Sequence, residues 1–117
     1  MKTFFASLSF VVVLAGSVSA LEIRVAPRTL VLSSNGGKLT VHTDAPYYPE
    51  AQVSLWVDGV ELDEVAVFHD DCGNLVAQAS KAAAAAAIGD FKGKMKRVTV
   101  TLVVDGVSAS GHLRVKK

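Results

Sequence analysis

The sequence has one cysteine, few prolines, few aromatic residues and almost no excess of charge of either sign. Cys72 is the single cysteine among 117 residues, so a disulfide within the chain is excluded and packing must supply the stability. Basic residues number 12 and acidic residues 11, for a net charge of +1. A chain this close to neutral has no global field to attract nucleic acid or an anionic membrane, and we expect neither as a partner.

The only long apolar stretch lies at the start of the chain. Lys2 supplies a positive charge, residues 4–14 are mostly apolar, and residues 16–20 are small. A bilayer span takes about 20 continuous apolar residues, which this stretch does not reach. The order is typical of a secretory signal cleaved after Ala20, and the alternative is an anchor that stays attached.

Cleavage near Ala20 predicts a secreted or periplasmic protein with no membrane insertion. Its mature part, residues 21–117, is long enough for one domain with one core. Cleavage also removes Lys2, which leaves 11 basic and 11 acidic residues from the 12 and 11 of the full chain.

Apolar and polar residues alternate through most of the mature part, as in strands with one buried face. The alternating or apolar segments are 21–25, 30–32, 39–43, 65–68 and 75–77. Two further segments, 53–60 and 100–107, each contain an Asp-Gly pair, which favours a two-residue type I′ hairpin turn. The segment 44–50 contains two prolines and is predicted to be a loop.

Six consecutive alanines follow Lys81 and predict one short helix. Ser80 can cap its first amides, and Gly89 suits the position after its last turn. We interpret it as a crossover helix between strands; the alternative is a helix that binds a partner.

About seven short strands with one Ala-rich helix predict a mainly β fold, an immunoglobulin-like β-sandwich without the cysteine pair of antibody domains. The segments "LVLSSNGGKLTVH", "VSLWVDGVEL", "FHDDCGNLVAQ" and "VTVTLVVDGVSASGHLRV" resemble the Ig-like β-sandwich modules of secreted and cell-surface bacterial and archaeal proteins. The resemblance covers about residues 28–115. It implies a structural or adhesive module and no enzyme.

Two candidate sites lie in the acidic turn between the segments 65–68 and 75–77. Asp70, Asp71 and Asn74 offer oxygens to Ca²⁺, but fewer than the six to eight that a calcium site uses, so we expect a hydrogen-bonded turn, no metal and no cofactor. We expect packing to hide the Cys72 thiol in a monomer; the alternative is a disulfide-linked dimer.

Three aromatic residues are candidates for binding. Trp56 is out of phase with Leu55 and Val57, so it should face the other side of its strand. If exposed, Trp56 would join Tyr47 and Tyr48 as a platform for sugar rings or an anchor for a protein; if covered, it is core. A basic run is also present: Lys92, Lys94, Lys96 and Arg97. We interpret this run as protection of the apolar strand that follows, with an anion-binding patch as the alternative.

The scattered histidines and the serines form no metal-ligand spacing and no catalytic triad that the sequence reveals. The sequence therefore favours a secreted, non-catalytic interaction or structural module that binds a protein or a cell-surface component. The alternative is a small carbohydrate-binding domain that uses the exposed aromatics on a surface glycan.

Overall fold

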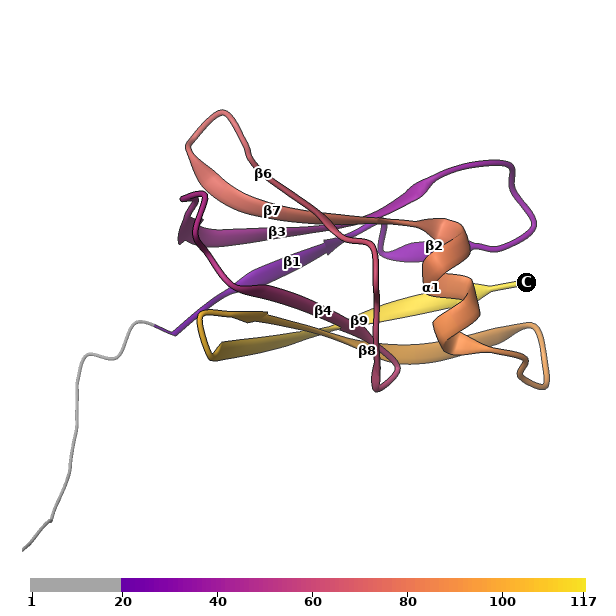
Figure 1. Cartoon of the computed structure of the whole chain (residues 1–117). Helices are drawn as coiled ribbons and strands as arrows, with labels where there is room; N and C mark the ends of the chain where they lie inside the picture. Colours follow the sequence, from indigo (N-terminus) through magenta and orange to yellow (C-terminus); the bar gives the residue numbers. More distant parts are fainter. Residues whose placement is uncertain (1–19) are drawn as a thin grey trace, which may run out of the picture.

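The computed structural model describes residues 20–117, and these form two β-sheets with one helix that connects them at one end (Figure 1). The predicted signal peptide lies outside the described residues except for Ala20. The four-stranded sheet has the order β1-β3-β7-β6, with bounds Ile23–Ala26, Lys38–Pro46, Asn74–Ser80 and Ala66–His69. The five-stranded sheet has the order β2-β9-β8-β4-β5, with bounds Thr29–Val31, Val107–Lys116, Met95–Val104, Val53–Val57 and Val60–Glu61.

The two sheets share one hydrophobic core. Figure 1 shows them as two layers, one above the other. Both layers contribute side chains that are fully buried: Leu39, Val41 and Leu75 from the first, and Leu55, Leu102 and Leu113 from the second. The alternation in the sequence turns every second residue of these strands inward, so burial of one face holds the layers together. The prediction of a mainly β fold is confirmed, and the layers are arranged as in a β-sandwich.

Both Asp-Gly pairs form the predicted hairpin turns. Asp58 and Gly59 have φ of 53° and 83°, and Asp105 and Gly106 have φ of 51° and 84°. Val57 pairs with Val60, and Val104 pairs with Val107. Two consecutive left-handed residues between paired valines define a type I′ turn, so the turn chemistry sets the register of both hairpins.

The alanine run forms α1, Lys81–Ile88, as predicted. The Ser80 hydroxyl accepts a hydrogen bond from the Ala83 amide at 3.0 Å, and the Gly89 amide donates to the Ala85 carbonyl at 3.0 Å. The helix leads from β7 in one sheet to β8 in the other and buries Ala84 and Ile88 at one end of the core (Figure 1). No helix in the described part of the chain is long and apolar enough to cross a membrane.

The prediction of a loop over residues 44–50 is wrong for its first three residues, because β3 continues to Pro46. The pairing with β7 shifts register between His42 and Pro46, so the proline sits at the strand end, where losing an amide donor costs least. Thr43 bridges the irregular stretch: its hydroxyl donates to the Leu75 carbonyl at 2.7 Å and accepts from the Ala45 amide at 3.1 Å.

β1 and β2 follow each other in the chain but lie in different sheets. β1 pairs antiparallel with β3, whereas β2 pairs in parallel with β9. The chain crosses from one sheet to the other at Pro27 and Arg28. Residues 20–117 form nine strands, against about seven expected, and the shortest of them, β5, has two residues.

The loop after β3 is tied to the turn between β8 and β9. The Tyr48 hydroxyl donates to the Asp105 carboxylate, and the Gln52 amide donates to the same carboxylate at 2.9 Å. The Asp105 amide donates in return to the Gln52 carbonyl at 2.8 Å. Asp105 therefore serves both as a turn residue and as an anchor for residues 48–52.

Asp105→Ala should destabilise the protein more than Asp58→Ala does. Both changes place alanine at a left-handed position of the same turn type. Asp105→Ala removes two hydrogen bonds that anchor the loop, whereas Asp58→Ala removes one partly exposed ion pair with Lys96, which contributes little to stability. We expect a difference of about 1–2 kcal/mol in the free energy of unfolding, measured by urea denaturation. Equal losses in the two variants would show that Asp105 does not anchor the loop.

Candidate functional site

The three aromatic candidates face different surroundings. The half-buried Tyr47 packs against the core, with its ring centroid 5.6 Å from that of His69. Tyr48 is 41% exposed and reaches Asp105. Trp56 is half-buried on the outward side of β4, whereas Leu55 and Val57 are fully buried. The alternation of β4 is as predicted, and a binding role for these aromatics stays a prediction.

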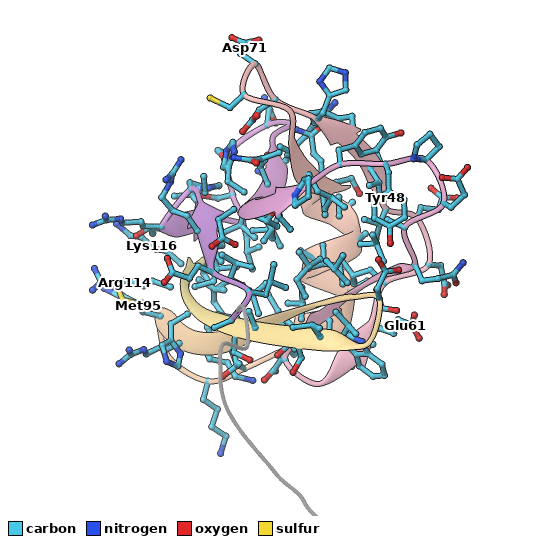
Figure 2. The ribbon with its side chains drawn as sticks, turned by 90° about the vertical axis from the view of Figure 1, so that its left-hand side faces the viewer. Tyr48, Glu61, Asp71, Met95, Arg114 and Lys116 are labelled. Atoms are coloured by element: carbon cyan, nitrogen blue, oxygen red, sulfur yellow. The ribbon has the colours of Figure 1, made fainter. Side chains whose placement is uncertain are left out.

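The acidic turn is closed by its own hydrogen bonds. One carboxylate oxygen of Asp70 accepts the amides of Cys72 at 2.8 Å and Asn74 at 3.0 Å. The Gly73 amide also donates to the Asp70 carbonyl at 3.0 Å. Asp71 lies at the tip of the turn, away from the body of the protein (Figure 2). Within residues 20–117, no group of three His, Cys, Asp or Glu side chains could hold a metal ion.

The expectation that packing hides Cys72 is wrong, because its side chain is exposed. The turn satisfies the backbone of residues 70–74 by hydrogen bonds to Asp70, so it needs no contact from the cysteine side chain. The thiol is left at the surface, free of any disulfide.

A cleft that the sequence did not predict lies where β1 meets β9. Its volume is about 670 Å³. All four arginines of the chain line it: Arg24, Arg28, Arg97 and Arg114. The other lining residues are Ile23, Val25, Thr29, Gly111, His112 and Leu113, so no carboxylate lines the cleft.

Four different segments bring the arginines together. Arg24 lies on β1, Arg28 on the crossover to β2, Arg97 on β8 and Arg114 on β9. Pairing of β2 with β9 begins at Thr29 and Arg114. Within the described residues, β9 therefore has no β2 partner from Gly111 to Leu113, and the cleft opens beside this free edge.

Gly111 lets the two sheets approach each other at the cleft. A Cβ at this position would lie 3.2 Å from Cγ2 of Val25, closer than most such contacts. The residue has no positive φ, so space rather than backbone conformation favours glycine here. Its absent side chain keeps β1, and with it Arg24, next to β9.

The guanidinium groups of the cleft repel one another. Arg97 and Arg114 are direct cross-strand partners, and like charges at such positions destabilise a sheet. The ion pair recorded among residues 20–117 joins Lys96 to Asp58, at 3.0 Å, and involves no arginine. Figure 2 shows Arg114 and Lys116 on one flank of the molecule and Glu61 on the opposite flank. In a nearly neutral chain, positive charge is thus gathered at the cleft.

Sequence reasoning missed this cleft because its residues are far apart in the chain. Arg24 and Arg114 each stand between two apolar residues, which predicts exposed strand positions but not their neighbours. In the basic run, Arg97 belongs to the cleft, whereas Lys96 pairs with Asp58. One signal was available in the sequence: no arginine has an acidic residue as its direct neighbour, and only Arg24 has one two positions away, Glu22.

Comparison with known proteins does not supply a function. The sequence matches no protein-family model, and no curated protein matches it.

The exposed thiol of Cys72 should react with a disulfide reagent such as Ellman's reagent without unfolding. The Cys72 thiolate forms a mixed disulfide with the reagent, which releases one equivalent of thionitrobenzoate. We expect this release from the native protein within about threefold of the time that the urea-unfolded protein takes. The Cys72→Ser variant should release none. A native protein that reacts only after urea is added would show that the side chain is covered.

Proposed function

We propose that this protein is a secreted, non-catalytic interaction module that holds anionic groups of a cell-surface component or a protein in the arginine cleft. The observation that carries the proposal is the convergence of all four arginines, from four segments, on one cleft that no carboxylate lines. Secretion is supported by the signal-like order of residues 1–20.

The physical argument rests on the cost of gathering like charges. Arg97 and Arg114 face each other across two strands, an arrangement that weakens the free protein. An anion bound between them would turn this repulsion into attraction. Guanidinium groups suit the task, because their planar donors fit sulfate, phosphate and carboxylate with two parallel hydrogen bonds.

We further propose that the module is an immunoglobulin-like β-sandwich. The support is the strand order. If β1 and β2 count as one divided strand and β5 as an added edge strand, β1, β3, β6 and β7 are the first, second, fourth and fifth strands. Their order in the four-stranded sheet, β1-β3-β7-β6, is then the order of that sheet in an immunoglobulin-like fold. The parallel pairing of β2 with β9 fits the same scheme. Modules of this architecture are commonly used for adhesion and recognition.

A second candidate function is carbohydrate binding through Trp56. The observation that favours it is the outward position of the indole on β4, beside the hydroxyl side chains of β8 and β9. Trp56 pairs with Thr101, whose hydroxyl lies 3.0 Å from that of Ser110. An aromatic face next to hydroxyl groups is a common surface for sugar rings.

Inorganic tripolyphosphate should raise the melting temperature of the protein, because a ligand that binds the folded state stabilises it. The double variant Arg97→Gln, Arg114→Gln should lose this rise. Without ligand, the same variant should be more stable than the parent by about 0.2–1 kcal/mol, since the repulsion between the paired arginines is removed.

The matched control is the double variant Lys92→Gln, Lys94→Gln, which removes the same charge outside the cleft. Its melting temperature should rise with tripolyphosphate as the parent's does. An equal loss of response in both double variants would mean that only overall charge matters, and would contradict the proposal.

A further inference from the structure

We infer that the ligand of the arginine cleft is an acidic polysaccharide, sulfated or rich in uronate, which extends over the outer face of the five-stranded sheet to Trp56. This inference rests on the proposed function and names the class of its ligand. It follows from the spacing of the arginines and from the residues that lie between them and the indole.

The arginines carry more charge than a single small anion can neutralise. Arg97, Arg114 and Thr29 lie side by side on β8, β9 and β2, and Arg28 immediately precedes Thr29. Adjacent strands are about 4.8 Å apart, so this row extends over about 10 Å. One sulfate or phosphate cannot neutralise the four positive charges of the cleft. A ligand that neutralises them must carry several anionic groups, as a charged polymer does.

The outer face of the sheet continues from this row toward Trp56. Along β8 the outward residues after Arg97 are Thr99 and Thr101. Their partners on β9 are His112 and Ser110. Four residues of strand cover about 13 Å, so a short oligosaccharide can reach from the arginine row to the indole. The path consists of hydroxyl and imidazole groups, which can hydrogen-bond to sugar hydroxyls.

The far end of this path favours a sugar over a nucleic acid. Trp56 is paired with Glu61 on β5 as well as with Thr101 on β8. The Glu61 carboxylate can accept hydrogen bonds from the hydroxyls of a sugar ring. The ten residues that line the cleft include no Phe, Tyr or Trp on which bases could stack beside the phosphates. A polysaccharide with anionic groups at one end of the bound segment fits both ends of the path.

The test uses the fluorescence of Trp56, the only tryptophan of the chain. Titration of the protein with a sulfated octasaccharide should change the emission of Trp56 and saturate. The Arg97→Gln, Arg114→Gln variant should bind about tenfold more weakly or worse, because it loses two charge-assisted contacts. The Lys92→Gln, Lys94→Gln variant should bind as the parent does.

A second variant separates the indole from the cleft. Trp56→Thr should weaken binding of the octasaccharide in calorimetry by about fivefold or more, since stacking on the ring is lost. The same variant should keep its response to tripolyphosphate, which is too short to reach β4. This pattern would support the inference, because loss of folding would abolish both responses.

Three results would overturn it. In the first, tripolyphosphate binds through the arginines, but the octasaccharide does not change Trp56 emission and binds the Trp56→Thr variant as tightly as the parent. The proposed function then stands, and the extended path is wrong. If an oligothymidylate of equal charge binds as tightly and with the same Trp56 response, the assignment to a polysaccharide is wrong. If no ligand shows a dependence on Arg97 and Arg114, the proposed function fails as well.

Discussion

The placement of the consecutive strands β1 and β2 in different sheets is the constraint on which the surface of this protein depends. β1 adds to the edge of one sheet beside β3, and β2 adds to the edge of the other beside β9. The chain must therefore cross between the layers at Pro27 and Arg28. The crossing covers one flank of the core, but it leaves part of the β9 edge without a partner strand. Gly111 completes the arrangement, because any side chain there would press against Val25.

The arginine cleft is a direct consequence of this crossing. The strands bring together guanidinium groups that the sequence keeps far apart, and no acidic side chain among the lining residues balances them. In a chain of nearly zero net charge, this concentrates positive charge on one flank while Glu61 lies on the other (Figure 2). Long-range attraction to nucleic acid or membranes depends on net charge, whereas recognition of an anion depends on such a local arrangement. The proposed anion binding therefore agrees with the overall neutrality.

Local patterns in the sequence predicted much of the fold. The alternation placed Leu55 and Val57 inward and Trp56 outward, the Asp-Gly pairs set both hairpin turns, and Ser80 and Gly89 marked the ends of α1. Each of these features depends on residues that are close in the sequence. The continuation of β3 to Pro46 was missed because Thr43 replaces ladder hydrogen bonds with its side chain, which no periodicity reveals.

The candidate site could not be predicted in the same way. It depends on β1 meeting β9, and these strands are separated by most of the chain and belong to different sheets. No local pattern specifies such a contact. Two of the residues that the sequence suggested as binding candidates make structural contacts instead. Asp70 accepts hydrogen bonds that close its turn, and the Tyr48 hydroxyl donates to Asp105. Each arginine, taken alone, is an ordinary exposed residue: three lie on strands and Arg28 lies on the crossover between two strands.

The central claim is that the four arginines act together on one anionic ligand, and NMR spectroscopy tests it most directly. A chain with four arginines gives four side-chain Nε–Hε signals in a ¹⁵N correlation spectrum. Addition of a sulfated octasaccharide should shift all four along one saturation curve and leave the backbone signals of Lys92 and Lys94 in place. Shifts confined to a single arginine, or to the loops around Tyr48 and Asp71, would contradict the account.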